Sequence, residues 1–222
     1  MSVLDEQTIG KVTEIFQNNL VDEVGLTVFT QEFECAFCKK VRELVQQLSA
    51  ISYRIRFEPY DFQKNSGKAK EYLVDKIPAT IMTGKKKYGI RFYGVPAGYE
   101  FLAFVDDIVD VSHNASRLSD PVKSRIRAIS KSVHIQVFTS PTCPYCYKVV
   151  RTAHQFAIEN ELIRADMVNA IEFPHLVNKY EVLGVPKIVI NETQQFVGTI
   201  SEDQFVDQIM MAIKTSTDGI YV

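Results

Sequence analysis

The sequence predicts an α/β protein built from two copies of one unit, and two observations lead to this prediction. The four cysteines form two Cys-x-x-Cys pairs, Cys35-Ala36-Phe37-Cys38 and Cys143-Pro144-Tyr145-Cys146. Pro78 follows Cys35, and Pro186 follows Cys143, by the same 43 positions. Two motifs that recur with one register indicate an internal repeat.

The first half alternates helical and strand patterns. Ile9, Val12, Phe16 and Leu20 share one helical face, and Cys38, Val41, Val45 and Leu48 share another. The predicted elements are a helix at 4–20, a strand at 26–30, a helix from Cys38, a strand at 53–58, a short helix at 68–73, strands at 77–82 and 88–93, and a helix at 100–109. We expect Asp106, Asp107 and Asp110 to form the polar face of that last helix.

The second half repeats this order. Polar residues at 113–120 mark the boundary, so we predict units at 1–117 and 118–222. The predicted elements are a helix at 121–129, a strand at 134–139, a helix with Cys146, Val149, Ala153 and Phe156 on one face, a strand at 163–168, a short helix at 173–180, strands at 185–190 and 194–197, and a helix capped by Ser201.

Composition narrows the class of protein. The chain has 222 residues, 46% of them hydrophobic, and a net charge of −2, which is typical of a soluble globular protein without a nucleic-acid partner. It lacks the run of about 18 apolar residues that would cross a membrane, and its first residues lack the features of a signal peptide. We therefore expect the cytoplasm, where paired cysteines are usually catalytic, redox-sensing or metal-binding.

The two cysteine pairs predict thiol–disulfide exchange. At a helix start, a Cys-x-x-Cys pair can close a disulfide without backbone movement, and the positive end of the helix dipole favours the thiolate of the first cysteine. Cys35 and Cys143 would attack a disulfide from an exposed position, and Cys38 and Cys146, on the buried side, would resolve the mixed disulfide. Such a protein needs only its two redox-active disulfides, Cys35–Cys38 and Cys143–Cys146, and no bound cofactor or metal.

Two other classes of function fit the same residues. Four cysteines in two pairs can hold a zinc ion, and an exposed thiolate can take part in iron–sulfur ligation, although the pairs open separate helices. A chaperone-like module would bind unfolded peptides on Phe33, Phe37 and Tyr145, the aromatic residues beside the thiols.

Each half resembles a thioredoxin or glutaredoxin unit, and Cys143-Pro144-Tyr145-Cys146 after Val137-Phe138-Thr139 is similar to the glutaredoxin active-site motif. The tandem arrangement, with Phe92-Tyr93-Gly94-Val95-Pro96-Ala97-Gly98 after the first hairpin, resembles the glutaredoxin-like protein disulfide oxidoreductases of thermophilic archaea and bacteria. This resemblance implies two thioredoxin-fold units, each with a central mixed four-stranded sheet flanked by helices.

The resemblance also implies an activity, partners and further site residues. The activity is reduction, oxidation or isomerisation of protein disulfides, with a thioredoxin-reductase-like flavoprotein as electron donor. A cis proline at Pro78 and at Pro186 would direct the backbone of Ile77 and Val185 toward each dithiol, where it could bind substrate. Thioredoxins carry a buried aspartate before the motif, whereas this chain has apolar residues there. Glu58, Asp61 and Asp166 are the candidate substitutes.

Overall fold

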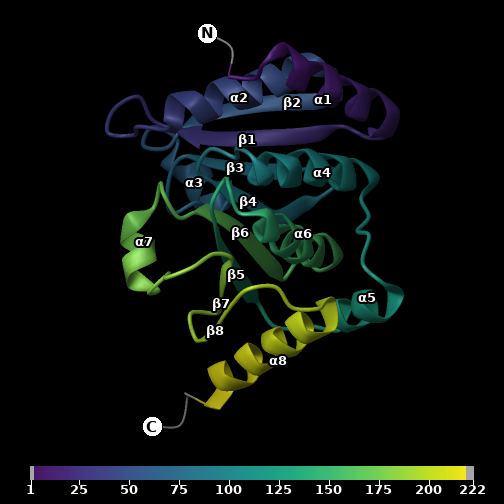
Figure 1. Ribbon diagram of the computed structural model, residues 1–222, viewed down its shortest axis with the longest axis vertical. Helices are drawn as coiled ribbons and strands as arrows, with labels where there is room; N and C mark the ends of the chain where they lie inside the picture. Colours follow the sequence, from purple (N-terminus) through teal and green to yellow (C-terminus); the bar gives the residue numbers. More distant parts are fainter. Residues whose placement is uncertain (1–2, 219–222) are drawn as a thin grey trace.

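The computed structural model describes residues 3–218, and its centre is one mixed sheet of eight strands with helices on both faces (Figure 1). In chain order the elements are α1 (Glu6–Asn19), β1 (Val24–Thr30), α2 (Cys38–Ile51), β2 (Ile55–Asp61), α3 (Ser66–Glu71), β3 (Ala79–Thr83), β4 (Lys87–Tyr93), α4 (Tyr99–His113), α5 (Asp120–Arg127), β5 (Val133–Thr139), α6 (Pro144–Glu159), β6 (Ile163–Asn169), α7 (Pro174–Lys179), β7 (Lys187–Ile190), β8 (Gln194–Val197) and α8 (Glu202–Asp218). The predicted α/β repeat is thus confirmed, with element ends shifted by a few residues.

The strand order β2-β1-β3-β4-β6-β5-β7-β8 shows how the two units are joined. Each unit contributes four strands in the same order, which confirms the predicted four-stranded sheets. Strand β4 of the first unit pairs in parallel with β6 of the second, over Ile90–Tyr93 against Ala165–Val168. The sequence did not predict this junction, which makes the two sheets one.

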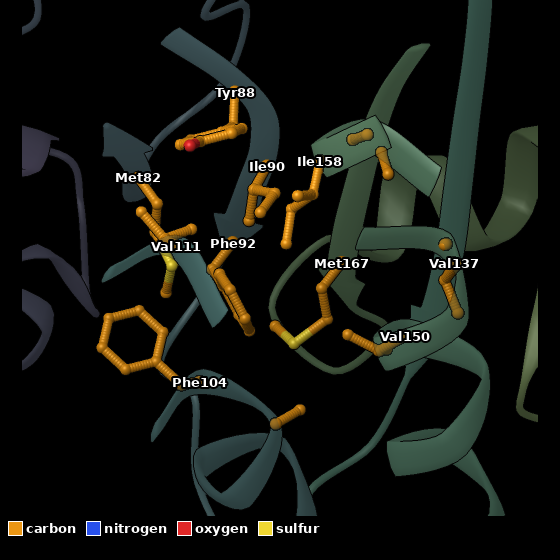
Figure 2. Packing of buried hydrophobic residues seen from close by; sticks show 14 of the residues in the cluster. Met82, Tyr88, Ile90, Phe92, Phe104, Val111, Val137, Val150, Ile158 and Met167 are labelled. Carbon is orange, nitrogen blue, oxygen red and sulfur yellow. The ribbon is translucent and has the colours of Figure 1, made fainter. Parts of the chain in front are cut away.

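The hydrophobic core runs through both units on each face of the sheet. On one face, Phe92 of β4 and Met167 of β6 are register partners, and Phe104 of α4 and Val150 of α6 pack over the same core (Figure 2). The other face buries a second cluster, in which Phe29 and Tyr93 of the first unit are joined by Phe138 of the second. Burial of apolar surface therefore holds the units together as well as each unit by itself.

Helix α6 is buried on nearly all sides, because it lies between its own sheet and α4 of the first unit. Its Arg151 forms ion pairs with Asp107 and Asp110 of α4, and His154 Nδ1 lies 2.6 Å from Asp107 Oδ2. Asp107 and Asp110 are both buried, so the prediction that they form an exposed polar face was wrong. Their basic partners come from a distant helix, which one helical pattern cannot reveal.

Local signals at the helix ends are confirmed. Ser201 Oγ accepts a hydrogen bond from Gln204 N at 3.2 Å, and Gln204 Oε1 accepts one from Ser201 N at 2.9 Å, which is a reciprocal cap. Pro121 lies in the first turn of α5. Among residues 3–218, no helix combines the length and the apolar character needed to cross a membrane.

Candidate active site

The first Cys-x-x-Cys pair follows β1, and its second cysteine, Cys38, is the first residue of α2. Cys35 and Cys38 form a disulfide with their Cα atoms 5.4 Å apart. Cys38 is buried and accepts a hydrogen bond on Sγ from Gln31 N at 3.4 Å, whereas Cys35 is only half-buried. The predicted division into an outer and an inner sulfur is therefore present at this site.

The second pair begins α6 directly. Cys143 is the N-cap residue, Pro144 occupies the first turn, and Cys143 and Cys146 form the second disulfide, also with 5.4 Å between Cα atoms. Cys146 N donates a hydrogen bond to Cys143 Sγ at 3.1 Å. A backbone donor at a helix N-terminus stabilises negative charge on that sulfur once the disulfide is reduced. Cys143 is only 8% exposed, so it is less accessible than the exposed position that we predicted.

Both predicted prolines follow cis peptide bonds, Ile77–Pro78 and Val185–Pro186. Each lies directly before a strand, β3 or β7, that pairs with the strand leading to the motif. Val185 O lies 3.7 Å from Cys143 Sγ, so the backbone before Pro186 does face the second dithiol. Phe37 and Tyr145, between the cysteines of each motif, are exposed.

The most perturbed acid near either motif is Glu100, which the sequence interpretation missed. This side chain is 1% exposed and belongs to α4 of the first unit. Its Oε1 accepts a hydrogen bond from Thr139 Oγ1 at 2.6 Å, and its Oε2 accepts one from Asn169 Nδ2 at 3.2 Å. Burial and, to a smaller extent, the nearby charge of Glu172 raise the pKa of Glu100 to about 7. The two hydrogen bonds act in the opposite direction, but they do not offset the effect of burial.

The chain places Glu100 beneath the loop that carries Cys143. Thr139 is the last residue of β5, and Tyr99 N donates to Pro141 O at 3.0 Å in the loop that follows. Gly98 has a positive φ of 53°, and a Cβ there would lie 2.2 Å from Pro141 O. Only glycine permits this approach. No motif spacing links Glu100 to Cys143, so the sequence offered no signal beyond the glycine before the helix.

The acids that the sequence suggested as proton acceptors have different surroundings from Glu100. Asp166 is fully buried on β6, and its Oδ2 lies 2.7 Å from His134 Nε2. Burial acts to raise the pKa of Asp166, but His134, Arg164 and Arg91 together hold it below its usual value. A carboxylate that stays ionised in this way is a poor proton acceptor near neutral pH. Asp61 turns its Oδ1 to the backbone N–H groups of Gln63 and Lys64.

The structure also bears on the alternative that the four cysteines bind a metal ion. Each cysteine is bonded to the partner in its own motif. Within the described part of the chain, no three His, Cys, Asp or Glu side chains are grouped as ligands for a metal ion.

Comparison with known proteins finds several that are similar to this chain. Residues 133–211 match the model of the thioredoxin domain. The chain is 22% identical over 217 residues to an NADH dehydrogenase of Bacillus subtilis, covering 98% of this chain and 39% of that protein. It is 25% identical over 153 residues to an alkyl hydroperoxide reductase component of Staphylococcus aureus, covering 69% of this chain and 28% of that protein. The chain thus spans well under half the length of these relatives.

Solved structures also match nearly the whole chain, and two of them show the shared fold. The N-terminal domain of an alkyl hydroperoxide reductase from Enterococcus faecalis shares the fold, with a TM-score of 0.85, 22% identity and coverage of 93% of this chain and 99% of that one. A protein disulfide oxidoreductase from Aeropyrum pernix has a TM-score of 0.90 and 29% identity, covering 97% of this chain and 95% of that one. The chain therefore has the thioredoxin fold and is similar to a protein disulfide oxidoreductase over nearly its whole length. This agrees with the resemblance seen in the sequence.

Proposed function

We propose that the chain catalyses dithiol–disulfide exchange with protein disulfides at both Cys-x-x-Cys sites. The observation that carries this proposal is the position of Cys143 Sγ, which receives a hydrogen bond from Cys146 N at a helix start and lies beside the backbone of Val185. A sulfur so placed is stabilised as a thiolate, and the thiolate is the attacking species in exchange.

The reaction follows from the two sulfurs of each site. In the reduced enzyme, the Cys143 thiolate attacks one sulfur of a client disulfide, and the other client sulfur leaves as a thiolate and is protonated. Cys146 then loses its proton and attacks Cys143 Sγ, which releases the client thiol and forms the Cys143–Cys146 disulfide. Two electrons pass from the dithiol to the client. Cys35 and Cys38 take the same roles at the first site, and the reverse sequence oxidises a client.

Glu100 is the proposed acceptor of the proton that Cys146 loses. Its pKa of about 7 lets the carboxyl group take up and return a proton at neutral pH. Its hydrogen bond with Thr139 holds it under the second motif. Glu172, which lines the hollow with Phe37 of the first motif, also has a pKa raised by burial, but it is only half-buried. The two sites therefore differ in their proton chemistry.

We also propose the residues that contact clients, the two functional units and the place of action. Ile77 and Pro78, with Phe37, would contact clients at the first site, and Val185 and Pro186, with Tyr145, at the second. The two functional units are residues 1–117 and 118–222, since the connection from α4 to α5 contains this division. The proposed place of action is the cytoplasm, where Cys-x-x-Cys pairs serve exchange.

A thioredoxin-reductase-like flavoprotein is the proposed electron donor. This is supported by the relatives, which are named as an NADH dehydrogenase and an alkyl hydroperoxide reductase component and are much longer than this chain. A reductase of this kind would deliver electrons from a nicotinamide nucleotide to one of the two disulfides.

Reduction of a protein disulfide client, with dithiothreitol as electron source, tests the proposal. We expect Cys35→Ser and Cys143→Ser each to retain the activity of the other site, and the double variant to fall to the uncatalysed rate. Cys38→Ser and Cys146→Ser should accumulate mixed disulfides with the client, which mass spectrometry detects. Full activity in the double variant would show that the sulfurs are not the reacting groups.

A further inference from the structure

The two dithiols follow strands β1 and β5, whose carboxyl ends lie on the same side of one sheet. Strands β1 and β3 are antiparallel, as are β3 and β4, while β4, β6 and β5 run in parallel, so β1 and β5 point the same way. Their ends are also level, because the pairing register runs from Phe29 through Ala79, Tyr93 and Val168 to Phe138. The first cysteine of each motif follows Phe29 or Phe138 by six or five residues.

The separation of the two strand ends follows from the strand order. Four strand spacings lie between β1 and β5, which at about 4.8 Å each gives about 19 Å. An extended polypeptide covers this distance with about six residues at roughly 3.3 Å per residue. One client segment could therefore reach from one dithiol to the other.

A hollow occupies the surface between the two motifs. It has a volume of about 170 Å³, and both active-site loops contribute to it. Its lining includes Phe37, Lys40, Val95, Pro141, Ile171 and Glu172. Phe37 lies inside the first motif, and Pro141 lies two residues before Cys143.

The residues that line the hollow are suited to bind a polypeptide segment with apolar side chains and polar backbone groups. Phe37 is 38% exposed and Ile171 is 68% exposed, and Tyr145 is 67% exposed in the second motif. Exposed apolar side chains gathered around a reactive centre mark an interaction surface. Lys40 and Glu172 supply one donor and one acceptor within the same lining.

We propose that the two dithiols share one client site, in which an extended apolar segment of a disulfide-bearing protein lies in this hollow between Cys35 and Cys143. The proposal rests on the exchange function proposed above. It deepens that function by naming the client as a segment that is extended and apolar, as in an unfolded or partly folded protein. A sulfur on that segment can then react at either site without release of the client.

Substitution of Ile171 by Glu tests the shared site, with Leu162→Glu as the matched control. Ile171 follows the end of β6 and Leu162 precedes its start, so both are exposed apolar residues at opposite edges of the sheet. Single-site backgrounds, Cys35→Ser/Cys38→Ser and Cys143→Ser/Cys146→Ser, report on each dithiol separately. The readout is the ratio of kcat/KM for an unfolded disulfide client to kcat/KM for a small non-peptide disulfide.

We expect Ile171→Glu to lower this ratio about fivefold or more in both backgrounds, as loss of one apolar contact would. Leu162→Glu should leave the ratio unchanged. A fall of the ratio in only one background, or in neither, would overturn the shared site. Turnover of the small disulfide would still show that the exchange function itself is intact. No turnover of either substrate by the wild type would instead remove the exchange function and the shared site together.

A covalent trap gives a second test. In the Cys38→Ser variant, a client peptide held on Cys35 as a mixed disulfide should slow the reaction of the second site with a protein client. Unhindered reaction at Cys143 would contradict one shared site. If Ile171→Glu changed the molecular mass in solution without changing the ratio, the hollow would be an interface between two copies of the chain, and the proposal would fail.

Discussion

At the scale of single residues, chemistry at the second site depends on how buried groups are paired. Glu100 and Asp166 are both buried carboxyl groups, but they differ in their neighbours. Asp166 faces His134, Arg164 and Arg91 and has a lowered pKa, whereas Glu100 receives only neutral hydrogen bonds and lies near Glu172, so its pKa is raised. A buried carboxyl group is therefore a fixed negative charge at Asp166 and a proton acceptor at Glu100.

Glu100→Gln tests the proton acceptor. The deprotonated carboxyl group is the form that accepts a proton, so turnover at the second site should rise as pH passes about 7 in the parent. We expect the variant to lose this step and about tenfold or more of its rate above that pH. The measurement is a pH profile in the Cys35→Ser/Cys38→Ser background. The first site, measured in the opposite background, is the control, and an equal loss at both sites would contradict the assignment.

Stability provides an independent readout of the same substitution. Folding raises the pKa of Glu100 from 4.5 to about 7, so the folded state binds the proton more tightly than the unfolded state. The parent should therefore lose stability as pH rises from about 4.5 to about 7, by on the order of 3 kcal/mol. Gln cannot ionise, so urea unfolding of the variant should show a flatter pH dependence across this range.

At the scale of elements, the junction between β4 and β6 decides how the two units meet. Gly89 lies directly before the paired segment, and a Cβ at this position would lie 2.0 Å from Ile163 O and 2.9 Å from Arg164 Cα. Both contacts are with backbone, which cannot rotate away. Glycine at position 89 therefore allows β6 to approach β4.

We expect Gly89→Ala to destabilise the protein by about 1–3 kcal/mol or more, because the strands must separate to accommodate the methyl group. Gly10→Ala is the matched control. Gly10 lies in α1 with open space around it, so Ala should instead stabilise the helix by about 0.5–1 kcal/mol. Urea unfolding measures both changes. A neutral Gly89→Ala would show that β4 and β6 are not held this closely.

At the scale of the whole molecule, the continuous sheet and the shared core predict that the units unfold together. The ion pairs of Arg151 with Asp107 and Asp110 also link α6 of the second unit to α4 of the first. A buried charge left without its partner is strongly unfavourable. Helix α4 of the first unit therefore supports the second dithiol, since it also carries Glu100.

Asp107→Ala should destabilise both units, by about 1–3 kcal/mol, because it removes the hydrogen-bonding partner of buried His154 and one of the two carboxylates that pair with Arg151. Hydrogen exchange detected by mass spectrometry should show equal loss of protection in β1 and β5. Asp203→Ala removes an exposed ion pair with Arg125 and should cost no more than about 1 kcal/mol. Loss of protection confined to β5 would show that the units open separately.

The sequence by itself determined the repeat, the order of elements and the two dithiols, because these depend on local periodicity and on residue spacing. Cys38 and Cys146 are buried where their helical stripes predicted, and Ser201 caps α8. The tertiary structure alone decided the β4–β6 junction, the burial of Asp107 and Asp110, and the place of Glu100 beneath the second motif. Each of these depends on residues far apart in the chain, whose burial and charge are set only when the two units pack together.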